Sequence, residues 1–292
     1  MIGSDESFEI HITDPQGQDM DLSHSDIKIV GAVVSYLGKG FSGFAYQPQQ
    51  ATVAGELLRA IEICLGEKPK LTAAGRTDAG VHARAQVVSF AISRGRQFEP
   101  ERFVKSMNSL LDERISVRKA WIAGEDFNAR HSARYRKYLY RFAYGLTRDP
   151  LTGGTSWLVQ EKLELSKMRE GAQALMGEHD FSSFCRKDPN GASLTRRVDE
   201  IRLEEISGGV DLWITASSFC HQMVRSIAGL LYQVGTLKKS PDYVVEALYA
   251  RDRSSVKLMA PASGLTLWEV GYDEGVLPRW TSCTNRPGEC WS

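Results

Sequence analysis

Residues 71–90 read LTAAGRTDAGVHARAQVVSF, in which two short apolar runs flank a turn bracketed by glycines. Glycine lets the backbone adopt angles that other residues avoid, so the pattern predicts two strands joined by a tight loop. We call residues 75–80 the Asp78 loop; Asp78 stands two residues after Arg76 and four before His82. Such a loop can hold a catalytic carboxylate rigidly at the mouth of a sheet. The alternative is a surface turn whose local ion pair contributes about 0–1 kcal/mol.

The sequence around this loop alternates between the periods of strands and helices. Pro100 favours a helix start, because proline suits the first helical turn. The predicted order of the first half is β-α-β-β-α-β, the split arrangement of ferredoxin-like domains. Its elements are a strand at 27–36, a helix with Val53, Leu57, Leu58, Ile61 and Leu65 on one side, strands near 70–75 and 84–92, a helix near 100–111 and a strand near 115–122.

The second half repeats this rhythm. One of its helices carries a regular apolar stripe, which is typical of a core-facing helix and not of a cofactor site. The predicted elements are a strand near 137–144, a helix near 166–176, strands near 197–205 and 211–218, the striped helix with Met223, Ile227, Leu230, Leu231 and Val234, a short helix near 242–250 and a strand near 265–272.

The chain is therefore predicted to be an α+β protein of two tandem ferredoxin-like domains with a catalytic cleft between their sheets. A cleft between domains is a usual place for a ligand. The predicted parts are a mobile acidic leader at 1–26, an N-terminal domain at 27–131 that carries the Asp78 loop, a C-terminal domain at 132–275 that completes the cleft, and a tail at 276–292.

Composition is that of an ordinary globular protein: of 292 residues, 42% are hydrophobic and 25% charged. No apolar run is long enough to span a bilayer. The N-terminus also lacks the basic region and following apolar segment of a secretory signal, so we expect no membrane association. Five cysteines show neither C-x-x-C pairing nor zinc-like spacing. We therefore expect free thiols in the cytoplasm, no metal and no cofactor.

Charge is unevenly distributed, although Lys and Arg equal Asp and Glu at 36 each. Residues 1–26 contain seven acids and no Lys or Arg. Residues 94–148, which we call the basic belt, contain thirteen Lys or Arg against six acids, a net charge of +7. Such a belt can contact the phosphates of a nucleic acid, although basic runs are often only solvated faces.

The string GRTDAGVHA at 75–83 resembles the catalytic loop of the tRNA pseudouridine synthase A family, and the similarity continues from about residue 27 to 272. The resemblance implies an isomerase that converts uridine to pseudouridine in the anticodon stem-loop of tRNA, works as a homodimer and needs no cofactor. The target base would be flipped out of its stack, at a cost of a few kcal/mol. Leu37 and Phe44 depart from the family's aspartate and tryptophan, which affects expected RNA contacts and not the chemistry.

Asp78 is the expected catalytic carboxylate, acting as a nucleophile or as a base at C2′ of the ribose. It has to be ionised, and burial beneath a base would disfavour the anion, so a nearby cation is required. Arg76 and Arg225 are both candidates. Since Arg225 lies about 200° around its helix from Met223, it faces away from the apolar stripe. The resemblance implies that Arg225 pairs with Asp78 and that Arg76 reaches the RNA.

Tyr138 is the expected partner of the uracil ring, because a phenol can stack on the base and accept the proton from C5. The segment from Phe127 that resembles the family places its active-site tyrosine at Tyr138, with Tyr135 and Tyr140 as alternatives. The other residues expected to bind substrate or RNA are His82, Lys137, His221 and Leu265, and the resemblance implies that Leu265 packs on the target base.

Two other functions compete with this hypothesis. A non-catalytic RNA-binding protein could keep the fold, but binding phosphates requires no isolated carboxylate, so the joint presence of Asp78, Tyr138 and Arg225 argues against it. A nucleotide-dependent oxidoreductase could use residues 38–43, GKGFSG, which have the G-x-G-x-x-G form. In that motif the third glycine opens a helix, whereas Pro48 disfavours a helix immediately before it.

Overall fold

The computed structural model describes residues 12–13, 18, 26–150, 153–187 and 191–277. Its first half contains the predicted strands and helices in the predicted order, although the strand expected at 70–75 keeps only two residues. The elements are β2 (Ile27–Tyr36), α1 (Val53–Leu65), β3 (Lys68–Pro69), β4 (Thr72–Ala73), β5 (His82–Ser93), α2 (Pro100–Leu110) and β6 (Ile115–Ile122).

The second half also follows its predicted order and adds two short strands that the sequence did not indicate, β8 and β9. The elements are β7 (Tyr135–Tyr144), β8 (Trp157–Val159), α3 (Leu165–Gln173), β9 (Gly177–Asp180), β10 (Thr195–Ile206), β11 (Gly209–Ala216), α4 (Met223–Gly235), α5 (Asp242–Ala250) and β12 (Leu265–Gly271), with short 3-10 turns at Gly153–Thr155, Arg253–Ser255 and Ala262–Gly264.

All these strands except β3 join one mixed ten-stranded sheet, in the order β6-β2-β5-β12-β7-β11-β10-β9, with β4 paired to β5 and β8 to β7. The halves meet where β12 runs parallel to β5, with Thr266 opposite His82 and Leu267 opposite Ala83. The prediction of a cleft between two sheets is therefore corrected, since the sheets of both halves are continuous. This junction involves few residue pairs and links remote segments, which explains why sequence periodicity did not reveal it.

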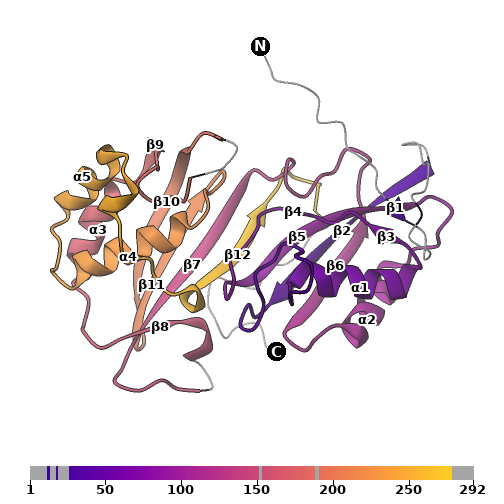
Figure 1. Ribbon diagram of the computed structural model, residues 1–292, viewed down its shortest axis with the longest axis horizontal. Helices are drawn as coiled ribbons and strands as arrows, with labels where there is room; N and C mark the ends of the chain where they lie inside the picture. The colour runs from indigo at the N-terminus through magenta and orange to yellow at the C-terminus, as the bar shows by residue number, and fades with distance from the viewer. Residues whose placement is uncertain (1–11, 14–17, 19–25, 151–152, 188–190, 278–292) are drawn as a thin grey trace, which may run out of the picture.

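Figure 1 shows α1 and α2 at one end of this sheet and α3, α4 and α5 at the other. Side chains of directly paired residues lie on the same face of a sheet. Tyr36 pairs with Ala83, and Leu267 pairs with both Ala83 and Tyr138, so these four residues share one face. Ala32, two pairs of residues before Tyr36 on β2, lines the interior beneath α1 and α2. We call this the site face.

The helices of the second half cover the same face. Tyr140, two residues after Tyr138 on β7, contacts Trp157 of β8, and Trp157 in turn contacts Tyr232 of α4 with ring centroids 4.4 Å apart. Both helical groups thus lie on the site face, and the β5–β12 junction lies between them. The other face, which we call the opposite face, carries the alternate residues of each strand.

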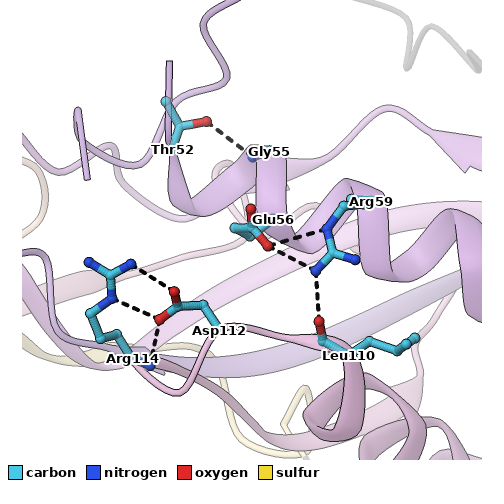
Figure 2. Close-up of polar contacts among 7 residues, drawn as sticks. All are labelled: Thr52, Gly55, Glu56, Arg59, Leu110, Asp112 and Arg114. Atoms are coloured by element: carbon cyan, nitrogen blue, oxygen red, sulfur yellow. Dashed lines mark hydrogen bonds and ion pairs between the residues drawn. The ribbon is translucent and has the colours of Figure 1, made fainter. Parts of the chain in front are cut away.

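Polar contacts join α1 to α2 and hold the turn between α2 and β6 (Figure 2). Thr52 caps α1 by accepting a hydrogen bond from Gly55 N, and Arg59 binds the carbonyl of Leu110 at the end of α2. Arg114 is held by both oxygens of Asp112 at 2.7 Å. The same guanidinium donates to Lys39 O and lies over the ring of Phe41, so this turn supports residues 38–43.

The predicted acidic leader is described only in part. Ile12 and Thr13 form β1, which pairs antiparallel with β3, and Ile12 is 1% exposed. These two residues of the predicted leader therefore pack against the fold. Most of the leader and residues 278–292 of the predicted tail lie outside the described residues. No helix in the described part of the chain is long and apolar enough to cross a membrane.

Candidate active site

Asp78 lies at the β5–β12 junction on the site face, where both halves of the chain contribute partners. Its Oδ2 accepts a hydrogen bond from Arg225 Nη1 at 3.0 Å, and its Oδ1 lies 3.1 Å from His221 Nε2. The Asp78 side chain is 21% exposed, so both oxygens are held while the carboxylate stays accessible. Of the two candidate cations, the structure pairs Arg225 with Asp78, whereas Arg76 is exposed.

Both partners of Asp78 come from one segment at the start of α4. Arg225 is further fixed because its Nε donates to Ala260 O at 2.9 Å, while Ala260 N donates back to Arg225 O. His221 precedes the helix and is exposed. Between them, Gln222 adopts φ 69°, a left-handed conformation uncommon for residues other than glycine. Backbone strain of this kind costs about 1–3 kcal/mol and clusters at functional sites.

Tyr138 forms part of the floor of this site. Its ring meets Phe219 edge-on with centroids 5.0 Å apart, and its hydroxyl points toward Gly75, 4.0 Å from where a Cβ atom would stand. The alternatives have other partners: Tyr135 donates to Glu269 on the opposite face, and Tyr140 donates to Pro261 O. Of the three tyrosines, only Tyr138 has Asp78 among the charges that shift its pKa; it is 7% exposed, and its contact with a base stays a prediction.

Burial raises the pKa values of the two tyrosine side chains that line the floor of the site, Tyr138 and Tyr36. Desolvation raises the pKa of Tyr138 well above the usual phenol range, and the negative charge of Asp78 adds to this effect. Desolvation also raises the pKa of Tyr36 to about 12, although its hydrogen bond to Thr77 Oγ1 opposes the shift. Both phenols are neutral at physiological pH. Asp78 thus faces uncharged rings below and two basic side chains beside it.

The glycine-rich residues 38–43 pack against the backbone of the Asp78 loop. A Cβ atom on Gly38 would lie 2.0 Å from Val81 O, and one on Gly43 would lie 2.8 Å from Thr77 O. Phe44 N donates to the same Thr77 carbonyl at 3.1 Å. The glycines are required for this close approach of two chain segments, which accounts for the motif without a bound nucleotide.

Two predicted RNA contacts lie elsewhere. His82 is buried, its Nδ1 accepts a hydrogen bond from Gly38 N at 3.0 Å, and burial lowers its pKa. His82 therefore supports residues 38–43 from inside the fold. Lys137 lies on the opposite face, 3.6 Å from Glu200 and over the ring of Trp213. The structure brings neither side chain to Asp78, because adjacent strand residues point to opposite faces.

Leu265 begins β12 on the site face, where it pairs with Tyr140. The turn before it touches the Asp78 loop, since a Cβ atom on Gly80 would lie 3.3 Å from Ala262 Cβ. Leu265 itself is 6% exposed, and its contact with a base stays a prediction.

The basic belt is not one continuous surface. At least six of its thirteen basic residues form ion pairs within the chain, and a seventh, Arg136, is buried. Intramolecular pairing reduces the charge available to phosphates, so the +7 count overstates the positive field. The paired residues are Arg94, Arg96, Arg114, Arg134, Lys137 and Arg141.

Sequence reasoning missed several side chains beneath the site. Tyr36 on β2 and Gln86 on β5 contact the Asp78 loop. Phe219 packs against Tyr138, and Arg136 donates to the carbonyl of Ala74, directly before the Asp78 loop. Buried polar residues on strands show no distinct spacing, so only the family-like segment around Phe219 carried a signal. No group of three or more His, Cys, Asp or Glu side chains in the described residues could hold a metal ion.

Comparison with known proteins identifies the class to which this fold and site belong. The sequence profile described as tRNA pseudouridine synthase matches residues 32–132 and 172–273, which include Asp78 and Arg225, while Tyr138 lies between the two matched segments. The chain belongs to the tRNA pseudouridine synthase family, whose members are isomerases. Among its relatives, the tRNA pseudouridine synthase A of Caulobacter sp. (strain K31) is 37% identical over 82% of this chain and 96% of its own length.

Two further relatives agree with this assignment. The tRNA pseudouridine synthase A of Bacillus subtilis (strain 168) is 37% identical over 82% of this chain and 97% of its own length. That of Ralstonia nicotianae (strain ATCC BAA-1114 / GMI1000) is 38% identical over 82% of this chain and 89% of its own length. The similarity therefore extends over both halves and not only over the Asp78 loop.

Proposed function

We propose that this chain converts uridine to pseudouridine in tRNA, with Asp78 as the catalytic carboxylate, Arg225 as its cationic partner and Tyr138 as the ring contact for uracil. The observation that carries the proposal is the accessible Asp78 carboxylate, bound by Arg225 at one oxygen and by His221 at the other. Family membership supplies the reaction class, and this geometry supports the residue roles.

The reaction breaks the bond between C1′ and N1, turns the uracil and joins C1′ to C5, while C5 loses its proton and N1 takes one up. It leaves the oxidation state unchanged. Asp78 can attack C1′ or remove a proton from C2′, and an ionised carboxylate is needed for either step. Arg225 stabilises that anion when a base covers the site and excludes water.

Tyr138 suits contact with an uncharged base, because its raised pKa keeps the phenol neutral. A neutral phenol can lie against the uracil ring while the ring turns. If Tyr138 also accepts the C5 proton, it must pass its own proton on, since burial disfavours the charged forms. Leu265 would cover the other side of the base, and the exposed Arg76 would contact RNA.

The anticodon stem-loop of tRNA is the proposed substrate region, because unstacking a base costs least in a loop that is already strained. A homodimer in the cytoplasm is the proposed state, and the free thiols of Cys64, Cys185 and Cys220 suit that reducing compartment. Each half is proposed to be a ferredoxin-like domain, since the strand orders β6-β2-β5-β4 and β12-β7-β11-β10 match each other.

Tritium release from tRNA transcribed with 5-³H-uridine tests the activity, because pseudouridine formation removes the C5 hydrogen. We expect release by the wild type and none by Asp78→Asn. Asp273→Asn is a matched control, since Asp273 also pairs with an arginine, Arg134, but at an exposed position. It should release tritium at the wild-type rate. Mapping the product should place pseudouridine in the anticodon stem-loop, and sedimentation should give twice the chain mass.

A folded wild type that releases no tritium from several tRNAs would contradict the proposed activity and favour the non-catalytic RNA-binding alternative. Release by Asp78→Asn would instead retain the activity and remove Asp78 from its centre.

A further inference from the structure

Arg136 on β7 is a buried cation whose partners are backbone carbonyl groups. It is 8% exposed and lies on the site face, two residues before Tyr138. Its Nε and Nη2 donate to Ala74 O at 3.1 and 2.7 Å, and Nη2 also donates to Arg130 O at 2.8 Å. Its Nη1 donates to Ala133 O at 3.2 Å and to Ser217 O at 2.7 Å.

These contacts use all five N–H donors of the guanidinium. Desolvation lowers the pKa of Arg136, which shows that burying this charge opposes its ionised form. The carbonyl dipoles compensate because each donor has an acceptor. A lysine could not reproduce the arrangement, since its three donors all diverge from one nitrogen.

Two of these carbonyls belong to residues that come directly before the two segments that form the site. Ala74 immediately precedes the Asp78 loop, and Ser217 lies four residues before His221 and eight before Arg225. They are 62 residues before and 81 residues after Arg136 in the chain. One side chain therefore joins the segment that carries the carboxylate to the segment that carries both of its partners.

Gln86 fixes the next point of the Asp78 loop. It is 0% exposed, and its Nε2 donates to Gly75 O at 2.6 Å. Arg136 and Gln86 thus bind two consecutive carbonyls, those of Ala74 and Gly75, directly before the turn. Neither side chain is positioned above the loop where the carboxylate is exposed, because both approach it from the buried strands β7 and β5.

We propose that Arg136 and Gln86 are positioning residues for the isomerisation, holding the Asp78 loop at a fixed height above Tyr138 and in register with His221 and Arg225. The proposal rests on the proposed catalytic role of Asp78. A misplacement of about 1 Å in a reacting group can lower a rate about 100-fold. Since neither residue reaches the accessible side of the site, the affinity for tRNA should not depend on them.

Single-turnover tritium release and tRNA binding, both measured per folded molecule, test this proposal with Arg136→Lys. We expect the rate constant for release to fall about 10- to 100-fold with the Kd for tRNA unchanged. Arg141→Lys is the matched control on the same strand, because Arg141 binds Asp211 on the opposite face. It should retain the wild-type rate constant.

Gln86→Leu decides the question if Arg136→Lys does not fold, since it keeps a buried side chain of similar size and removes the donor to Gly75 O together with the side-chain hydrogen bond to Tyr36. It should lower the rate constant in the same way, without weakening tRNA binding. A wild-type rate constant in the folded variant, or a loss matched by weaker tRNA binding, would overturn the proposal. An active wild type with an inactive Asp78→Asn would show that the proposed function stands even then.

Discussion

Two aspartate–arginine pairs lie on opposite faces of the same sheet. They differ in the number of hydrogen bonds from arginine to the carboxylate and in how far the carboxylate is exposed. On the opposite face, Asp211 accepts two hydrogen bonds from Arg141, both at 2.7 Å, and its side chain is 3% exposed. On the site face, Asp78 receives one hydrogen bond from Arg225 and one contact from His221, and its side chain is 21% exposed.

The difference separates a structural carboxylate from one available for chemistry. A bidentate arginine satisfies both oxygens in fixed geometry and leaves a buried carboxylate no access to a substrate. Single contacts at each oxygen orient the Asp78 carboxylate and leave each oxygen able to accept a further hydrogen bond. Net charge and residue type are the same in both pairs, so geometry and exposure carry the distinction.

Exchanging the carboxylate for an amide should therefore affect the two pairs in opposite ways. Asp78→Asn should lower tritium release at least about 1,000-fold, because it removes a group that acts on the substrate. Asp211→Asn should retain activity per folded molecule but lower the free energy of unfolding by about 3 kcal/mol, since Arg141 loses its buried partner. Urea unfolding and tritium release, measured on both variants, test this contrast.

A stable Asp211→Asn protein that loses activity would contradict the division of roles between the faces. Normal activity of the Asp78→Asn protein would also contradict this division of roles.

The alternation along β7 explains which parts of the site were predictable. Consecutive side chains of a strand point to opposite faces, so placing Tyr138 on the site face puts Lys137 on the opposite one. Lys137 therefore lies away from Asp78, and its contact with RNA stays a prediction. Helix geometry predicted only that Arg225 faces away from the apolar stripe, and its pairing with Asp78 was implied by the family resemblance. The family-like spacing then distinguished Tyr138 from its neighbours Tyr135 and Tyr140.

The remaining features depend on contacts between remote segments. Arg136 was counted in the basic belt because its type suggests exposure, whereas the fold buries it against four carbonyl groups. His82 was predicted to meet RNA, but the residues 38–43 that enclose it come from a distant part of the chain. The parallel pairing of β5 with β12 has no local sequence signal either. The longer strands and the helices follow from local patterns, whereas the short strands β8 and β9 did not.

The two partners of Asp78, Arg225 and His221, can be compared with each other in the same way, with smaller expected effects. Arg225→Gln should lower the rate constant for tritium release about 100-fold, as expected when one donor to a reacting charge is removed. His221→Gln should lower it about 10-fold or less, because the His221 side chain is 50% exposed and solvent screens its contact with Asp78. Single-turnover assays with saturating tRNA measure both effects; equal losses would mean that exposure does not rank the partners.

The smallest effect concerns the floor of the site face and appears only at alkaline pH. The pKa of Tyr36 is raised to about 12, whereas an unfolded chain releases the phenol proton near the ordinary value of 10.0. As the pH rises from about 10 to about 12, the unfolded state loses this proton first, so the free energy of unfolding must fall. Two pKa units correspond to about 3 kcal/mol, fully present below pH 10 and lost by about pH 12.

Tyr36→Phe isolates this contribution from other alkaline titrations, including that of Tyr138, which remain in both proteins. The variant loses the hydrogen bond to Thr77 Oγ1, so below pH 10 it should be about 1 kcal/mol less stable than the wild type. Above pH 10 the wild type should lose stability more steeply, and the two curves should converge and cross before pH 12. Parallel curves from urea unfolding across this range would mean that the Tyr36 phenol ionises as readily in the folded protein as in the unfolded chain, and that the floor beneath Asp78 does not exclude charge.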